Sequence, residues 1–293
     1  MYNKKSTWTR GQVIKYLGGL SGGVILYPGA LIKPVHKKNR FKIGACDWSI
    51  GKRGELEAFN QAKKIGLDGI QVSFARNEQE IHMLSREIQK EYLQAARRTG
   101  VQIGGLALGI LNHIPYKSDP RAEQWVLDSI DVADALGCKV ILLAFFGEGD
   151  IKGDRKGTME VINRLKKVAP KAEEKNIVLG IESWLSAPEH MEILEAVGSS
   201  HVKVYYDVAN SNKMGYDIYS EIRWLGDNIC EFHAKENGYL LGKGEIDFIE
   251  VRKALDYINY SGWIHIEGAI PSGKEIYESY VLNRKFMHST FDL

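Results

Sequence analysis

Along the chain from Phe41, short runs of apolar residues alternate with longer segments in which apolar residues recur every three to four positions. The short runs are typical of buried strands, and the spaced segments are typical of helices with one buried face. Gly66, Gly100, Gly137 and Gly262 follow spaced segments and are expected to end helices. The runs that predict strands cover residues 41–48, 69–74, 101–108, 139–146, 176–183, 201–208, 229–235 and 263–269.

Eight strand–helix units fill residues 41–293, at about 32 residues each, which is the size expected for the units of a (β/α)8 barrel. The main alternative is an open, doubly wound parallel sheet. Such a sheet usually carries a G-x-G-x-x-G turn after its first strand, and none follows residues 41–48. No linker or low-complexity segment interrupts residues 41–293, so we predict a single α/β domain, a TIM barrel.

The first forty residues differ from the rest of the chain. Lys4, Lys5 and Arg10 precede an uncharged stretch, residues 16–32, that is rich in small side chains. A basic start, a short apolar centre and a small-residue end are typical of an export signal of the Sec or twin-arginine type. We therefore predict that residues 1–40 are a leader, removed or disordered, and that the protein is periplasmic. The alternatives are a retained membrane anchor and a cytoplasmic protein.

Composition limits the partners of the chain. It carries 39 basic and 37 acidic residues, for a net charge of +2, so nothing attracts it strongly to nucleic acid or to an anionic membrane. Membrane attachment is expected only through an uncleaved leader. Cys46, Cys138 and Cys230 are an odd and scattered set, so we predict buried free thiols rather than a disulfide or a catalytic cysteine.

Four polar side chains stand at the downstream ends of the last four predicted strands, and they are Glu182, Asp207, His233 and Glu267. In a TIM barrel the carboxyl ends of the strands form one face, where the chemistry takes place. We therefore expect the four groups to converge on one point. Three carboxylates and one imidazole, without a thiolate, suit a single divalent cation, with Mn²⁺ in first place and Mg²⁺, Zn²⁺, Co²⁺ or Fe²⁺ as alternatives.

The residues around these four groups form recognisable motifs in the second half of the chain: IES (181–183), YDVAN (206–210), HAKE (233–236), GKGEID (242–247) and IEG (266–268). CDWS (46–49) and GLDGIQV (66–72) add to them from the first half. With these motifs the region 41–293 resembles the xylose isomerase-like TIM barrel family, which includes sugar isomerases and epimerases, inosose dehydratases and endonuclease IV. The resemblance implies that Glu182 and Glu267 bind the cation and also form the proton-transfer pair of a sugar isomerase or epimerase.

The chemistry of such a pair agrees with this implication. A proton on a carbon next to a carbonyl can be removed if the enediolate that forms is stabilised, and a divalent cation does this as a Lewis acid. One carboxylate would remove the proton, and the other would return it to the opposite face or to the neighbouring carbon. The same intermediate would also serve a keto-sugar or inosose-type lyase or dehydratase.

Two further classes are weighed against this hypothesis. A non-catalytic sugar-binding barrel would not need both Glu182 and Glu267. An endonuclease IV-type nuclease is not expected, because Asn210 interrupts the D-x-x-H pair that its zinc cluster uses and the chain has no basic stripe. We therefore expect a small sugar or polyol substrate and no nucleic-acid partner. The resemblance implies that the protein can form a homo-oligomer.

Further side chains near these strand ends are candidates for binding the substrate. Asn210 stands where the resemblance leads us to expect a histidine, so it keeps hydrogen bonding but cannot transfer a proton, which argues against a classical ketohexose epimerase. Packing is the alternative role for the tryptophans, and a solvated position is the alternative for Lys235. The candidate substrate-binding residues are Lys235, Asn210, His113, Trp48, Trp184 and Glu236.

Strand parity yields one more prediction. His265 shares a strand face with Glu267, and Glu231 shares a face with His233. If the two cation ligands point into the barrel, His265 and Glu231 should lie one layer below them, where they would orient the ligands and tune their basicity. A bulge that turns one of them outward is the alternative.

Overall fold

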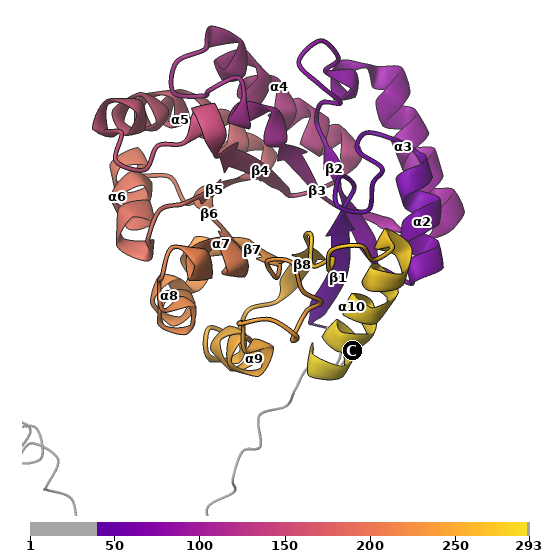
Figure 1. The fold of residues 1–293 in the computed structure, drawn as a ribbon. Helices are drawn as coiled ribbons and strands as arrows, with labels where there is room; N and C mark the ends of the chain where they lie inside the picture. The colour runs from indigo at the N-terminus through magenta and orange to yellow at the C-terminus, as the bar shows by residue number, and fades with distance from the viewer. Residues whose placement is uncertain (1–39, 292–293) are drawn as a thin grey trace, which may run out of the picture. The chain divides into compact units, whose positions relative to one another are not determined.

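The computed structural model describes residues 40–291, which form a closed barrel of eight parallel strands surrounded by helices (Figure 1). Each strand pairs with its neighbours in sequence order, and the last strand pairs with the first. This closure confirms the predicted TIM barrel and excludes the open sheet for the described residues. The strands are β1 (Phe41–Cys46), β2 (Gly69–Ser73), β3 (Gln102–Leu108), β4 (Val140–Phe145), β5 (Val178–Ser183), β6 (Val202–Asp207), β7 (Ile229–Ala234) and β8 (Gly262–Ile266).

The helices form the outer ring of the barrel (Figure 1). The α-helices are α2 (Glu57–Ile65), α3 (Arg86–Thr99), α4 (Pro120–Leu136), α5 (Arg155–Lys175), α6 (Ala187–Val197), α7 (Val208–Lys213), α8 (Ile218–Leu225), α9 (Phe248–Tyr257) and α10 (Ile276–Phe291). Four short 3-10 turns lie between them, η2 (His82–Leu84), η3 (Gly109–Asn112), η4 (Gly147–Gly149) and η5 (Gly226–Asn228).

Three of the four glycines predicted to end helices do so. Gly66, Gly100 and Gly137 follow α2, α3 and α4 in the left-handed conformation, and their backbone N–H groups bond to carbonyls of the last turn. The prediction is wrong for Gly262, which is the first residue of β8. Helix α9 ends earlier, at Tyr257, and the positive φ of 52° in the connection belongs to Asn259.

The barrel has two buried regions of different character. Apolar side chains from the outer faces of the strands pack against the helices and form the main core. The inner faces carry a much smaller apolar cluster, which includes Ala107, Leu142 and Ala144. Polar side chains fill much of the remaining interior, and Gln71, Glu231, His233 and His265 are all at most 3% exposed. A polar barrel interior is costly unless its groups are paired, so it indicates a functional role.

Two sequence predictions concern export and the thiols. The predicted leader, residues 1–40, lies outside the described residues except for Arg40, so export and a periplasmic location stay predictions. Within residues 40–291, no helix is long and apolar enough to cross a bilayer. Cys46, Cys138 and Cys230 are free, as predicted, although Cys230 is only partly buried.

Candidate metal and substrate site

The four predicted ligands lie at the carboxyl ends of four neighbouring strands. Glu182 is on β5, Asp207 ends β6 and His233 is on β7, while Glu267 directly follows β8. The side chains of the first three are almost fully buried, and that of Glu267 is 16% exposed. Because all eight strands are parallel, these ends share one face of the barrel.

The four side chains converge as expected from their strand ends. His233 Nδ1 lies 2.9 Å from Glu182 Oε1, 3.6 Å from Glu267 Oε2 and 3.9 Å from Asp207 Oδ2. One ligand atom from each of the four residues lies within 4.8 Å of the corresponding atoms of the others. We refer to Glu182, Asp207, His233 and Glu267 as the quartet.

The quartet fits a divalent cation on two observations. Ligand atoms held about 2.0–2.2 Å from one cation lie roughly 3–4 Å apart, which matches the distances from His233 Nδ1. The two oxygens of Asp207 also differ. Oδ1 accepts hydrogen bonds from the backbone N–H groups of Ala209 and Asn210, whereas Oδ2 is buried and has no hydrogen-bond partner among residues 40–291. A buried carboxylate oxygen without a donor is well suited to a cation.

The electrostatics of the quartet reflect three acidic groups in one buried place. Burial raises the pKa of Asp207 to about 7, with Glu267 and Glu182 adding to the rise against the opposing charge of Lys235. Burial also acts to raise the pKa of Glu267, but the charges of His233 and Lys235 outweigh it and lower that pKa to about 2. A bound divalent cation would relieve the repulsion among the carboxylates.

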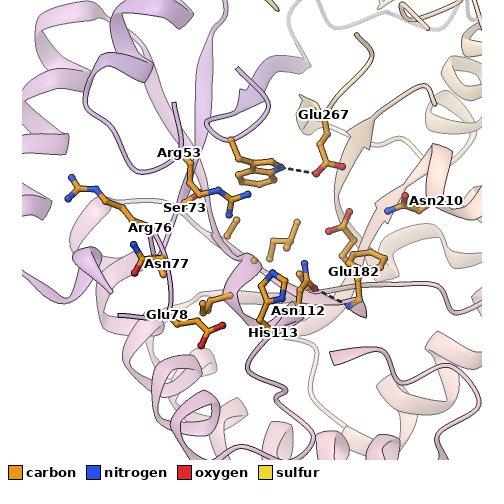
Figure 2. A pocket seen from close by; sticks show the side chains of 18 of the residues that line it. Arg53, Ser73, Arg76, Asn77, Glu78, Asn112, His113, Glu182, Asn210 and Glu267 are labelled. Atoms are coloured by element: carbon orange, nitrogen blue, oxygen red, sulfur yellow. Dashed lines mark hydrogen bonds between the residues drawn. The ribbon is translucent and has the colours of Figure 1, made fainter. Parts of the chain in front are cut away.

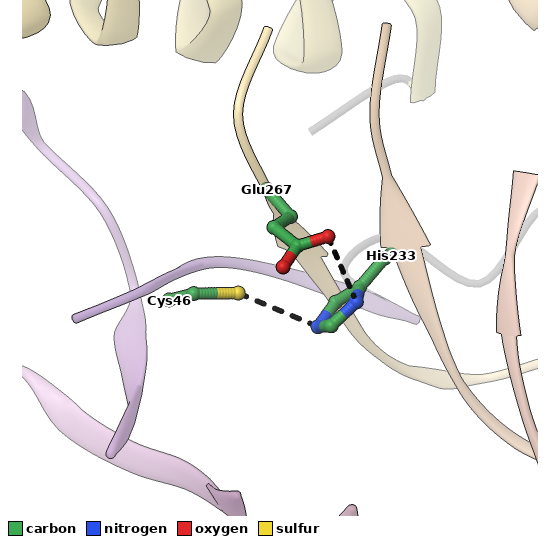
Figure 3. Close-up of side chains that lie close together, drawn as sticks. All are labelled: Cys46, His233 and Glu267. Atoms are coloured by element: carbon green, nitrogen blue, oxygen red, sulfur yellow. Dashed lines mark hydrogen bonds and ion pairs between the residues drawn. The ribbon is translucent and has the colours of Figure 1, made fainter. Parts of the chain in front are cut away.

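A second group of potential ligands, Cys46, His233 and Glu267, also lies close together. Figure 3 shows that Cys46 and Glu267 approach different nitrogens of the imidazole. Cys46 Sγ is 3.4 Å from Nε2, whereas Glu267 Oε2 is 3.6 Å from Nδ1. Burial raises the pKa of the Cys46 thiol to about 12, so it stays protonated at neutral pH. A cation on Nδ1 would therefore have the other members of the quartet, and not Cys46, as its potential ligands.

A cavity of about 630 Å³ opens next to the quartet, which is within the usual size range of small-ligand sites (Figure 2). Glu182 and Glu267 both line it. Of the six candidate substrate-binding residues, five line it as well: Lys235, Asn210, His113, Trp48 and Trp184. The cavity thus brings together most of the residues that the sequence singled out.

Glu236 is the sixth candidate, and it is not among the residues that line the cavity. It is buried, and its carboxylate accepts hydrogen bonds from backbone N–H groups of the loop after β7, among them that of Ile246. The structure therefore places Glu236 as a brace for residues 242–246. Its contact with substrate stays a prediction, and the position of its side chain outside the cavity lining does not support it.

Lys235 and Trp48 both hold Glu267. Lys235 Nζ donates to Glu267 Oε2 at 2.8 Å and to Asn210 Oδ1 at 3.3 Å, and it lies 3.5 Å from Asp207 Oδ2. Trp48 Nε1 donates to the other Glu267 oxygen, a bond drawn as a dashed line to Glu267 in Figure 2. Both oxygens of Glu267 are thus fixed, and an ammonium group lies at the edge of the cavity beside the quartet.

The inner layer predicted from strand parity is present. His265 and Glu231 are buried in the barrel, with His265 Nε2 3.6 Å from Glu231 Oε2. An added Cβ at Gly44 would clash with the His265 ring, so the glycine makes room for it. Neither residue hydrogen-bonds to the quartet within residues 40–291, and their influence on the ligands stays a prediction.

Sequence reasoning missed several residues of the site. Gln71 and Tyr205 contact His233, and Arg53, Asn77 and Asn112 line the cavity (Figure 2). A glutamine in the middle of the buried strand GIQVS is an unusual feature that could have drawn attention to Gln71. Nothing in the local sequence distinguishes Arg53 from a surface arginine.

Taken together, the fold and the quartet define a TIM barrel with a candidate divalent-cation site at the carboxyl ends of its strands. Comparison with known families identifies it further, since residues 59–281 match the xylose isomerase-like TIM barrel model. The chain belongs to that family, as the motifs in its sequence indicated.

Individual relatives are sugar epimerases. The chain is 30% identical to D-psicose 3-epimerase of Enterocloster bolteae over 136 residues, which are 43% of this chain and 44% of that protein. It is 27% identical to 2-epi-5-epi-valiolone 7-phosphate 2-epimerase of Actinoplanes sp. over 215 residues, covering 70% of this chain and 78% of that protein. A solved structure of D-psicose 3-epimerase in the presence of D-fructose matches with a TM-score of 0.72 and 18% identity, covering 85% of this chain and 99% of that one. The first match spans less than half of its relative's length, and the last supports the fold alone.

Proposed function

We propose that the protein is a divalent-metal-dependent sugar epimerase or isomerase that acts through an enediolate, with Glu182 and Glu267 as the acid–base pair. The observation that carries the proposal is the position of these two carboxylates. They come from β5 and from the residue after β8, with Asp207 and His233 between them, and both line the same cavity. A sugar carbon held in that cavity beside the quartet would have both carboxylates within reach.

The reaction follows from this arrangement. One of the two glutamates accepts the proton from the carbon next to the substrate carbonyl. The electron pair of the C–H bond forms the C=C bond of the enediolate, and the π pair of the carbonyl moves onto its oxygen. The other glutamate donates a proton to the opposite face, which gives an epimer. Return of the proton to the neighbouring carbon, together with transfer of the hydroxyl proton from one enediolate oxygen to the other, gives the isomer instead. A bound cation supplies Lewis-acid stabilisation of the negative charge on the oxygens.

Other residues of the cavity have roles in binding. Lys235 Nζ, which already lies among Glu267, Asp207 and Asn210, is placed to bind a substrate oxygen on which negative charge develops. The aromatic faces of Trp48 and Trp184 can stack on a sugar ring. We infer Mn²⁺ as the first cation to test because three of the four ligands are carboxylates. A small keto-sugar or polyol is the proposed substrate class.

The proposal is tested by solvent deuterium exchange. The protein is incubated in deuterium oxide with a panel of keto-sugars, both free and phosphorylated. Mn²⁺ is added to the samples used to measure turnover, and Mg²⁺ is added to the samples used for NMR. The expected result is deuterium at one carbon next to the carbonyl, together with an epimer or isomer. Glu182→Gln and Glu267→Gln should each abolish the exchange. Loss of water or of a substituent from the substrate would indicate a lyase, and tight binding without exchange would contradict the proposal in favour of a binding protein.

A further inference from the structure

The nitrogen of His233 that faces away from the cavity contacts a side chain from the far side of the barrel. His233 Nε2 lies 2.9 Å from Gln71 Oε1. Gln71 is on β2 and His233 is on β7, which are not neighbouring strands, so this contact runs through the barrel interior. Both side chains have no exposed surface. The His233 imidazole of the quartet is therefore in contact with a buried amide, which no local sequence pattern indicated.

The orientation of the Gln71 amide is set by two other residues. Its Nε2 donates a hydrogen bond to the Tyr205 hydroxyl at 3.1 Å, and its Oε1 accepts from the Cys46 thiol at 3.4 Å. These contacts direct the oxygen toward His233. An amide oxygen can only accept, so the Nε2 atom of His233 must carry a proton. Cation binding requires the imidazole to give up its other proton, and the lone pair is then on Nδ1, the nitrogen that faces the three carboxylates.

Tyr205 supports this arrangement in a second way. Its ring packs against the His233 imidazole, with 4.6 Å between ring centroids and an angle of 59°. Tyr205 therefore contacts both the amide of Gln71 and the ring of His233, and it helps to orient the imidazole.

We propose that Gln71, held by Tyr205 and Cys46, is a positioning residue that fixes His233 as the Nε2–H tautomer and presents Nδ1 to a divalent cation. This inference rests on the cation site of the proposed function. If Gln71 had a merely structural role, its amide would satisfy its own hydrogen bonds and would have no influence on metal affinity. Hydrogen bonds to the second nitrogen of a metal-binding histidine typically change metal affinity by about 10- to 100-fold.

The test compares two substitutions of Gln71 with one matched control. Gln71→Met keeps the length of the side chain but removes the acceptor, and Gln71→Glu keeps an acceptor for Nε2–H. Tyr260→Phe is the control. The Tyr260 hydroxyl donates to the backbone carbonyls of Cys230 and Trp263, and within residues 40–291 it has no hydrogen bond to Gln71, Tyr205, Cys46 or His233. Each protein is titrated with Mn²⁺ by calorimetry, and the tautomer of His233 is read from ¹⁵N chemical shifts in the Mg²⁺-loaded or Zn²⁺-loaded protein.

We expect Gln71→Met to weaken Mn²⁺ binding about 10- to 100-fold and to perturb the His233 ¹⁵N shifts, while Gln71→Glu and Tyr260→Phe stay within about threefold of the wild type. Gln71→Met with wild-type affinity and the same tautomer would overturn the inference and leave the proposed function standing. Absence of Mn²⁺ binding in the wild type would instead refute the cation site itself. If Gln71→Met does not fold, Tyr205→Phe, which removes only the hydroxyl that anchors the amide, should weaken binding severalfold, and an unchanged affinity would overturn the inference.

Discussion

The indole Nε1 of Trp48 donates a hydrogen bond of 2.9 Å to Oε1 of Glu267. Trp48 lies in the loop after the first strand of the barrel, and Glu267 directly follows the last, so the bond joins the chain where the barrel closes. The loop is itself held by Asp47, whose carboxylate accepts hydrogen bonds from the Ser73 hydroxyl at 2.6 Å and from the Gly54 backbone at 3.0 Å. One of the two proposed proton-transfer groups is thus fixed by an aromatic side chain that also lines the cavity.

Replacing Trp48 by phenylalanine separates these two roles. Trp48→Phe keeps an aromatic face for the substrate and removes the donor to Glu267. A hydrogen bond to a charged group is worth about 1.5–3 kcal/mol, so we expect kcat to fall about tenfold or more with a smaller change in KM. Steady-state kinetics on the substrate found by deuterium exchange measure both constants. A Trp48→Phe enzyme with wild-type kcat would show that the bond to Glu267 has no catalytic consequence.

Removal of the Lys235 ammonium group is expected to change metal affinity and turnover in opposite directions. It lies 2.8 Å from Glu267 Oε2 and 3.5 Å from Asp207 Oδ2, close to where the cation would sit. Like charges repel, so Lys235→Met should strengthen Mn²⁺ binding, by about tenfold, because the repulsion is lost. Turnover should fall, since the group that binds the substrate oxygen is gone.

Calorimetry and steady-state kinetics check the two halves of this prediction separately. Lys235→Arg serves as the control because it keeps the positive charge and should keep Mn²⁺ affinity near the wild-type value. Weaker Mn²⁺ binding in Lys235→Met would mean that the lysine supports the ligands more than it repels the cation.

Metal binding should also stabilise the barrel. A cation present at one hundred times its Kd adds about 2.7 kcal/mol to the free energy of unfolding, which corresponds to several degrees in Tm. We expect thermal unfolding of the chelator-treated protein to shift upward when Mn²⁺ is added. In Asp207→Ala, where the quartet has lost one ligand, the shift should be largely absent. An equal shift in both proteins would place the stabilising cation elsewhere.

His190 gives the fold a pH dependence that is independent of the quartet. Its Nδ1–H donates to the Ser186 carbonyl at 3.1 Å, so its Nε2 accepts from the Ser183 hydroxyl at 3.0 Å, and the neutral ring braces the loop after Glu182. Burial lowers the pKa of His190 to about 4. The unfolded chain takes up a proton near its ordinary pKa of about 6.5, so the stability from this residue is complete above that pH and is lost as the pH falls toward about 4.

The pH dependence is measured by urea unfolding of the wild type and of His190→Gln. Between about pH 7.5 and about pH 5, the wild type should lose about 2 kcal/mol more than the variant, because only the wild type binds this proton on unfolding. His82, whose pKa is also lowered to about 4 by burial, contributes equally in both proteins. Parallel curves for the two proteins would mean that His190 is protonated in the native state.

The sequence was informative where periodicity and strand ends decide the structure. The eight apolar runs located all eight strands, and the convergence of Glu182, Asp207, His233 and Glu267 followed from parallel strands that end at one face. Parity along β7 and β8 also placed Glu231 and His265 inside the barrel. These inferences need only the repeat of a regular structure.

Contacts across the barrel and within loops could not be predicted in the same way. Gln71 meets His233 because β2 and β7 face each other through the interior, which depends on the barrel's diameter and on its register shifts, such as the one between Val204 and Tyr205. Glu236 lies just after a strand end, where a site residue is expected. The loop that follows it folds back, however, and backbone N–H groups of that loop donate to its carboxylate. Such outcomes depend on tertiary geometry that no local pattern encodes.

The most direct test of the proposed cation site is the stoichiometry of Mn²⁺ binding to the metal-free protein, measured by calorimetric titration. We expect one cation per chain, with at least 100-fold weaker binding in Asp207→Ala and in His233→Leu. Asp217→Asn, which changes a carboxylate that caps α8 through the Ser220 backbone, should bind like the wild type. No binding by the wild type, or undiminished binding by Asp207→Ala and His233→Leu, would contradict the claim that the four strand ends hold a single cation.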